Sequence, residues 1–243
     1  MINAGNGMTG NGTRGGSIGR ALAGFAACVL LGALLGGVSM RPVAAQNPAP
    51  APAAAGAKPG PNDRQITLAV KSYVEREHFT KHPIDDEIAR RWFSIFLEAL
   101  DPMKVYFLQS DVDGFMQKRD TLDDLVKRGD VSFAYEVYNR FLERVDSRLP
   151  LVEKFLAEPL DFNQDESIVV DRDSTTWAQS EAEAVDNWRK RIKYDLLVQK
   201  MEKTPAEEAK DKLLRRYKSF ARRMHQMTAD ELLETYLTSL TSS

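Results

Sequence analysis

The stretch Leu100-Asp-Pro-Met-Lys-Val-Tyr-Phe-Leu-Gln-Ser-Asp-Val-Asp-Gly-Phe115 lies between two helical segments, yet its apolar residues follow neither helical nor strand periodicity. Asp101-Pro102 should end the preceding helix, because proline lacks an N–H and disfavours the α conformation in the residue before it. Four apolar residues, 105–108, come next, and Ser110-Asp111 offers an N-cap for the following helix. Connecting segments are normally polar and run over the surface. An apolar connector therefore predicts a buried elbow between two helices.

The sequence on both sides of this elbow is helical almost throughout. Apolar residues recur at helical spacing in segments 66–78, 84–100, 111–126, 131–155, 180–201, 205–227 and 229–239. Segment 111–126 should be two short helices divided near Asp120-Thr121, and Pro150 should kink or interrupt the segment that contains it. We therefore predict an all-α fold of about seven helices in one irregular helical domain.

Several residues mark the ends of these helices. Gly129 is a candidate C-cap and Asp130 a candidate N-cap. Thr204-Pro205 suggests an N-cap followed by proline in the first turn, and Thr228 has Glu231 at capping-box spacing. Between residues 160 and 176 the helical periodicity is lost. That segment contains Ser167-Ile-Val-Val170, a strand-like run that cannot form a sheet alone.

The first 45 residues have the pattern of a signal peptide. Arg14 and Arg20 precede an apolar stretch from Ala21 to about Met40, and Val43-Ala44-Ala45 places small residues before a cleavage site. We predict cleavage between Ala45 and Gln46. An uncleaved membrane anchor formed by residues 21–40 is the alternative, because about 20 apolar residues can span a bilayer. The single cysteine, Cys28, lies in the apolar stretch, so the mature chain should contain no disulfide.

Residues 46–63 are rich in proline and alanine and predict a disordered linker that does not pack. Residues 64–243 remain, enough for one domain with a sizeable core. The formal net charge of −2 gives no indication of nucleic-acid binding.

Four segments carry a resemblance to a known family. The L-D-P-x-K-x-Y-F-L-x-S-D pattern of the elbow resembles the N-terminal helical domain of the tail-specific (C-terminal-processing, Prc-like) serine proteases of the bacterial envelope. Tyr73-Val-Glu-Arg-Glu-His-Phe79, the region from Trp177 to Trp188, and Ala229-Asp-Glu-Leu-Leu-Glu-Thr-Tyr-Leu237 extend the resemblance over about residues 64–243. In that family a PDZ domain and a catalytic domain with a Ser-Lys dyad follow. This sequence ends at Ser243, and we expect both to be absent from it.

The resemblance implies a function for the chain. It would be the scaffold and substrate-gating domain of a periplasmic endopeptidase that degrades proteins with apolar, unstructured C-termini, and it would be inactive alone. Its partners would be such substrates, the PDZ and protease domains in cis, and an envelope lipoprotein adaptor. The alternatives are a stand-alone secreted helical binding or adaptor protein and a membrane-anchored helical protein.

The sequence itself predicts no catalytic, cofactor-binding or metal-ligating residue. His78 and His82 have helical spacing, but Pro83 breaks the helix that this spacing needs. The acidic run from Asp161 to Asp165 lacks the glycine and the final glutamate of a calcium loop. Lys218 and Ser219 are adjacent, and neighbouring residues on a helix point in different directions, so they should not form a dyad.

Charge is distributed unevenly along the chain. Between Asp186 and Gln226 there are thirteen basic and six acidic residues, whereas residues 85–130 hold eleven acidic and seven basic residues. The basic segment could be a solvated helical face or could contact an acidic partner, anionic lipid or the carboxylate end of a substrate chain. Ion pairing between the two halves is an equally simple explanation.

Overall fold

The structure is a computed structural model that describes residues 56–77 and 83–243. The predicted signal peptide, its cleavage site, the candidate span 21–40, Cys28, and the first part of the predicted linker lie outside the described residues, as do His78 and His82. None of the helices in the described part is long and apolar enough to cross a membrane.

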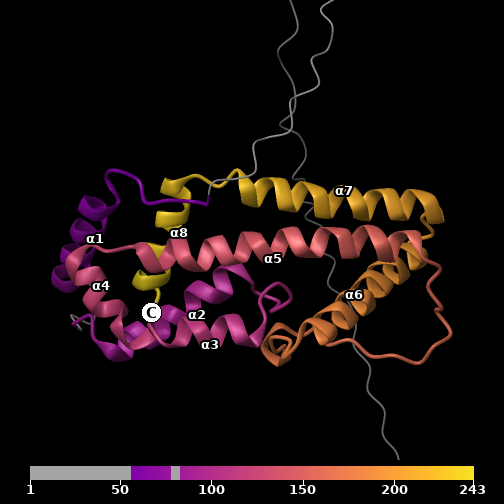
Figure 1. Ribbon diagram of the computed structural model, residues 1–243, viewed down its shortest axis with the longest axis horizontal. Coiled ribbons are helices and arrows are strands. Elements are labelled where there is room, and N and C mark those ends of the chain that lie inside the picture. Colours follow the sequence, from indigo (N-terminus) through magenta and orange to yellow (C-terminus); the bar gives the residue numbers. More distant parts are fainter. Residues whose placement is uncertain (1–55, 78–82) are drawn as a thin grey trace, which may run out of the picture. The chain divides into compact units, whose positions relative to one another are not determined.

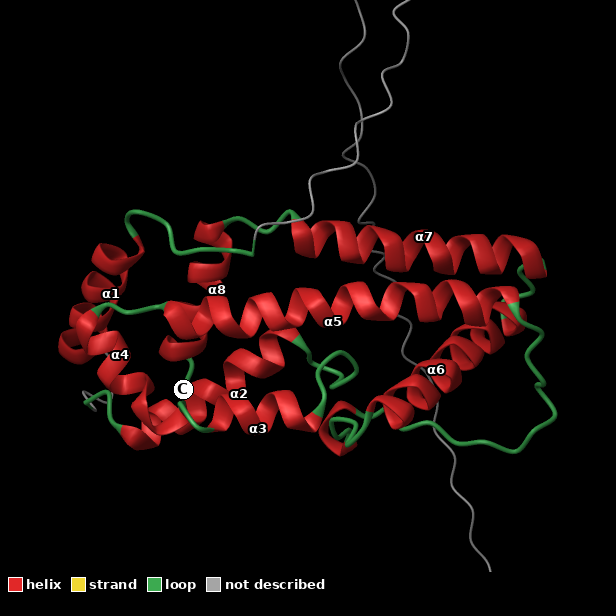
Figure 2. Cartoon of the chain, viewed as in Figure 1, coloured by secondary structure: helices red, strands yellow, loops and turns green. Residues whose placement is uncertain are grey.

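The described residues form eight α-helices and two short 3₁₀ helices, which confirms the all-α prediction (Figures 1 and 2). The elements are α1 (Asp63–Glu77), α2 (Asp86–Leu100), α3 (Gln109–Met116), η1 (Arg119–Thr121), α4 (Leu122–Arg128), α5 (Ser132–Ala157), η2 (Arg172–Ser174), α6 (Glu181–Met201), α7 (Ala206–His225) and α8 (Ala229–Thr241). In these residues the strand-like run 167–170 is not a strand, and one isolated parallel bridge joins Leu108 to Ala178.

Side chains and a glycine fix several helix ends, and the sequence predicts two of them, the start of α8 and the end of α4. The Asp85 carboxylate accepts the amide N–H groups of Glu87 and Ile88 at the start of α2. At the start of α8 the Thr228 hydroxyl and the Glu231 carboxylate form the predicted capping box. Gly129 ends α4 with a φ of 69°, a left-handed conformation that glycine adopts without a steric penalty.

Other predicted helix ends are displaced by one or two residues. Ser110-Asp111 does not cap α3: the helix begins at Gln109, and Asp111, in its first turn, accepts the Leu108 N–H at 2.9 Å. The cap of α7 is Pro205 rather than Thr204. Asp130 is not the assigned cap of α5, although its carboxylate does accept the Ser132 N–H at 2.9 Å. Carboxylates can bind the N–H groups near a helix start from more than one position, which explains the offsets at α3 and α5.

Two predictions that rest on proline were wrong in part: that α5 is interrupted at Pro150, and that the end of segment 46–63 does not pack. A kink of α5 at Pro150 stays a prediction. The helix α5 is not interrupted at Pro150, because that residue is exposed and removes only one backbone hydrogen bond, while Val145 and Val152 are buried on either side of it. The last residues of the predicted Pro/Ala linker also pack on the domain. The Asn139 side chain accepts the Ala57 N–H at 2.7 Å and donates to the Ala57 carbonyl at 3.1 Å. Because these bonds use only backbone atoms of Ala57, the side-chain composition of the linker does not prevent them.

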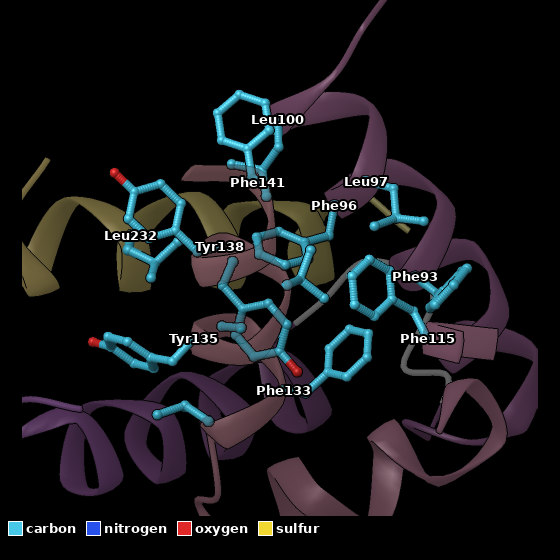
Figure 3. Packing of buried hydrophobic residues seen from close by; sticks show 14 of the residues in the cluster. Phe93, Phe96, Leu97, Leu100, Phe115, Phe133, Tyr135, Tyr138, Phe141 and Leu232 are labelled. Atoms are coloured by element: carbon cyan, nitrogen blue, oxygen red, sulfur yellow. The ribbon is translucent and has the colours of Figure 1, made fainter. Parts of the chain in front are cut away.

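The longest helix, α5, organises two hydrophobic cores along its length. Its first four turns pack with α2 and α8 in the larger core, and Figure 3 shows Tyr138 and Phe141 of α5 among residues of those helices. The Nε1 of Trp92 in α2 donates to the Tyr236 carbonyl in α8 at 2.9 Å inside this core. The last part of α5 packs with α6 and α7 in a smaller core that includes Val152, Phe155, Leu156, Trp188, Ile192, Leu213 and Tyr217. The elbow 101–108 lies where the two cores meet.

Candidate functional site

The elbow is shaped by one buried carboxylate. Asp101 is fully buried, and its two oxygens accept the backbone N–H groups of Val105, Tyr106 and Phe107 at 2.9, 3.0 and 3.1 Å. Burial raises the pKa of this carboxyl, while the three amide donors favour the charged form and oppose that rise. The backbone N–H groups of the turn that follows α2 thus donate to an acid side chain rather than to water.

Tyr106 connects the two hydrophobic cores. Its ring stacks on Phe220 of α7, with centroids 5.3 Å apart, and makes edge contacts with Phe141 of α5 and Trp188 of α6 at 5.3 and 5.5 Å. Burial raises the pKa of its hydroxyl. Phe107 is buried as well and contacts Phe141 and Phe115. The predicted buried elbow is therefore confirmed, and it contacts three later helices.

Hydrogen bonds fix the elbow to the second half of the chain. The Trp188 Nε1 in α6 donates to the Val105 carbonyl at 2.9 Å, and Gln109 N–H donates to the Ala178 carbonyl at 2.9 Å. Lys104 has a φ of 52°, which is uncommon for a residue with a side chain. Its Nζ reaches the Thr175 carbonyl at 2.9 Å and lies 5.3 Å from the centre of the Trp177 ring.

Two arginines of α5 complete this connection. Arg144 forms a bidentate pair with Asp111 at 2.7 and 2.9 Å, and the fully buried Arg148 binds Glu181 at the start of α6. Partial burial of the Asp111 carboxyl opposes ionisation, but the hydrogen bonds from Arg144 and from the Leu108 N–H outweigh it and lower its pKa. A bidentate arginine pair also fixes orientation, so the entry to α3 is held against α5.

Comparison with known proteins finds that residues 70–243 match the family model described as the tail specific protease N-terminal domain. This chain belongs to the tail-specific protease family. It is 31% identical over 172 residues to a protein of Haemophilus influenzae named tail-specific protease. The aligned part covers 70% of this chain and 25% of that relative. The chain thus spans about a quarter of the length of the curated relative that it matches.

The matched range contains the whole elbow and the three helices whose rings contact Tyr106, which are α5, α6 and α7. The described part of the tail-specific protease chain outside it is limited to residues 56–69. These include the N-terminal end of α1, where the buried Asp63 accepts the Tyr135 hydroxyl at 2.7 Å and the Gly60 N–H at 2.9 Å. The family resemblance and the physical junction of the two cores therefore coincide.

The basic segment of this tail-specific protease domain does not pair with the acidic half of the chain. Among the described residues, its ion pairs are to acids of the same helix or of nearby segments: Arg189 and Lys193 with Glu166, Lys190 with Asp186, Lys210 with Glu207, Arg216 with Asp195, and Lys218 with Glu153. Acids of segment 85–130 pair instead with Arg90, Arg91, Arg119, Lys127, Arg140, Arg144 and Arg172. The simple explanation of pairing between the two halves was wrong.

The residues considered for chemistry in the sequence are not brought together. Lys218 is exposed and binds Glu153 at 2.8 Å, so it is not the desolvated base that a Ser-Lys dyad needs. Residues 161–165 form an exposed turn in which Asp161 accepts the Asn163 N–H. Within the described ranges no three His, Cys, Asp or Glu residues are placed to hold a metal ion.

Sequence reasoning missed the two most informative charged residues. Asp101 was interpreted only as a helix breaker, although an acid a few residues before an apolar run in a connector can bind the amides of that run. Arg148 lies on the buried stripe of α5, between Val145 and Val152. A charge at a core position of a helix predicts an ion-pair partner, and that signal was available.

Proposed function

We propose that this chain is the N-terminal scaffold and substrate-gating domain of a periplasmic C-terminal-processing serine endopeptidase, and that it has no peptidase activity alone. Its substrates would be proteins with apolar, unstructured C-termini. Its partners would be a PDZ domain and a protease domain in cis, with an envelope lipoprotein adaptor as a further partner. The signal peptide would be cleaved near Ala45-Gln46 on export.

One observation carries this proposal: the part of the chain that matches the family is the part that the Tyr106 junction holds in one shape. A domain whose role is to present a surface to a protease core needs a fixed arrangement of helices more than a reactive group. The junction supports this role, because one aromatic side chain and one buried carboxylate together fix helices α2, α5, α6 and α7.

The first experiment tests the chain alone. Purified residues 46–243 are incubated with an unfolded protein that ends in apolar residues, with the Haemophilus influenzae relative as the positive control. We expect no cleavage by the chain. Peptidase activity that co-purifies with the chain in independent preparations would refute the proposed inactivity.

The second experiment tests the scaffold role. Residues 56–243 replace the matching N-terminal part of the Haemophilus influenzae tail-specific protease, and cleavage is compared with that of the remainder lacking any N-terminal domain. The chimera should cleave the substrate, and Tyr106→Ala in the chimera should reduce cleavage far more than Tyr106→Phe. Equal cleavage with and without the helical domain would contradict a scaffold role.

A further inference from the structure

A pocket of about 290 Å³ lies between the elbow, the connector from α5 to α6, and α6 itself. Figure 1 shows this connector running back beside α6 from the end of α5. Basic and hydroxyl side chains share the pocket wall with apolar ones, and the residues used below are Lys104, Ile168, Thr175, Lys190 and Arg191. One carboxylate, Glu183, also lines the pocket, and it accepts the Gln179 N–H at 2.8 Å.

Arg191 is the unusual residue of this pocket. Its side chain is half-buried, its Nε is fully buried without a hydrogen-bond partner, and no described residue forms an ion pair with it. The neighbouring cations of α6 all have carboxylate partners: Arg189 with Glu166 and Asp186, Lys190 with Asp186. Arginine stays charged in proteins, and a buried unpaired donor is costly. The pocket thus holds a cation that has no carboxylate partner among the described residues.

The connector offers an unpaired backbone edge beside this cation. Residues 167–170 make no hydrogen bond with any described residue, and the side chain of Ile168 is half-buried in the pocket wall while Val169 is 55% exposed. The segment is anchored on one side by Glu166, which binds Arg189 and Lys193. Those two cations lower the pKa of Glu166 to about 2. On the other side Asp171 caps η2. The segment is thus held at both ends, and its unpaired backbone N–H and C=O groups can pair with an added strand as the exposed edge of a sheet does.

We propose that this pocket binds an extended peptide that pairs its backbone with residues 167–170 and places a carboxylate on Arg191. Lys104 and Lys190 add positive charge around the carboxylate, whereas the Thr175 hydroxyl already donates to the Arg172 carbonyl at 2.7 Å. The peptide carboxylate is either its C-terminal group or the side chain of an aspartate or glutamate. Such binding would not require the protease role proposed above.

Charge complementarity and chemistry favour this ligand over a free anion. Three cations face the pocket against the single carboxylate of Glu183, so the ligand should be anionic. A free phosphate would satisfy Arg191 but would leave the backbone edge and the half-buried Ile168 unused. A peptide with a carboxylate uses all three features together.

The test measures binding of fluorescent peptides to the full chain by anisotropy. The first peptide alternates valine and threonine and ends in a free carboxylate, the second is its C-terminal amide, and the third is the amide with an internal glutamate. Binding of the first alone would identify the C-terminal carboxylate, and binding of the third would identify an acidic side chain. Arg191→Gln should weaken binding about tenfold or more, because it removes a charge-assisted pair.

Two variants separate specific binding from general attraction. Arg215→Gln removes an exposed cation from α7, outside the pocket, and should leave the affinity unchanged. Val169→Pro removes one N–H of the free edge without breaking a hydrogen bond of the structure. It should weaken peptide binding while leaving the melting temperature of the chain unchanged.

Several results would overturn the proposal. These are no binding of any of the three peptides at millimolar concentration, equal affinity of the parent and Arg191→Gln chains, or equal affinity of the parent and Val169→Pro chains. Displacement of the peptide by inorganic phosphate at equal concentration would show a simple anion site instead. A dimer of the chain that dissociates on Arg191→Gln would show that a second copy, rather than a peptide, supplies the carboxylate.

Discussion

The indole N–H of Trp188 donates a 2.9 Å hydrogen bond to the carbonyl of Val105, 83 positions earlier in the chain. This bond joins the middle of α6 to the elbow that follows α2. On the next residue, Tyr106, the aromatic ring contacts Trp188 itself and rings of α5 and α7. A short non-helical segment therefore fixes helices from both hydrophobic cores, and its variants should affect the whole domain.

Substitution of Tyr106 tests the junction of the cores. Tyr106→Ala should lower the free energy of unfolding by about 3–5 kcal/mol, because it removes three ring contacts and leaves a cavity. Tyr106→Phe keeps the ring, and the lost hydroxyl makes no hydrogen bond with a described residue, so its effect should be below about 1 kcal/mol. Urea unfolding of the two variants measures both values. Full stability of Tyr106→Ala and Phe107→Ala would show that the elbow is an exposed contact surface.

Asp101 should be equally important for a different reason. Asp101→Ala leaves three backbone N–H groups without an acceptor, which should lower stability by about 3 kcal/mol or more. Asp101→Asn should also destabilise the domain, because one of the two acceptor oxygens becomes a donor that faces amide N–H groups. The exposed Asp113→Asn is the matched control and should change stability by less than about 0.5 kcal/mol. Equal effects of the two asparagine variants would exclude the proposed role of Asp101.

The Asp111–Arg144 pair predicts that the difference in stability between the parent chain and Asp111→Asn depends on pH. Because the pKa of Asp111 is lower in the folded chain, its carboxylate stabilises the fold above the unfolded-state pKa of about 4, and this stabilisation is lost as pH falls through the folded-state pKa. Asp111→Asn should therefore lower stability by about 2 kcal/mol at pH 7, and by progressively less below pH 4. Urea unfolding of both proteins from pH 7 to pH 3 gives the difference. A difference that does not shrink in acid would show that charge is not the cause.

Substitution of two glycines by alanine should have opposite effects on stability. Gly129 has a positive φ, and a Cβ there would lie 2.9 Å from the Arg64 carbonyl oxygen, so Gly129→Ala should destabilise by more than about 1 kcal/mol. Gly114 lies inside α3, and a Cβ there would meet open space. Gly114→Ala should therefore stabilise the chain by about 0.5–1 kcal/mol. Thermal or urea unfolding that ranks the two variants in the reverse order would contradict these local conformations.

Pro150 should be a site where stability can be gained. The residue is exposed inside the continuous helix α5, so Pro150→Ala restores one backbone hydrogen bond without removing a buried contact. We expect the free energy of unfolding to rise by about 1 kcal/mol, part of the roughly 3 kcal/mol intrinsic difference between the two residues in a helix. An unchanged or lower value would indicate that the surrounding packing depends on the proline ring.

The fold could be predicted from the sequence because its main signals are local. Helical periodicity, Gly129 and the Thr228–Glu231 capping box each act within a few residues, and the structure confirms them. Pro150 was misjudged because tertiary packing on both sides of it outweighs its local preference. The partner of Ala57 is Asn139, 82 positions away, and no local pattern could identify it.

The elbow shows the same division between local and distant information. Its burial could be predicted from four apolar residues in a connector, but its contacts could not, because Trp188 and Phe220 are distant in sequence. The pocket beside it was not predicted either. Arg191 belongs to a run of basic residues. Only the structure shows that its neighbours form ion pairs, while Arg191 forms none with the described residues.

The most direct test of the elbow is hydrogen–deuterium exchange of the amide groups that Asp101 binds. If the elbow belongs to the cooperative core, the Tyr106 and Phe107 amides should exchange only through global unfolding, with an opening free energy equal to that from urea unfolding. Exchange of these amides at the rate of an exposed connector, while the amides of α2 and α5 stay protected, would contradict the claim that the elbow joins the two cores.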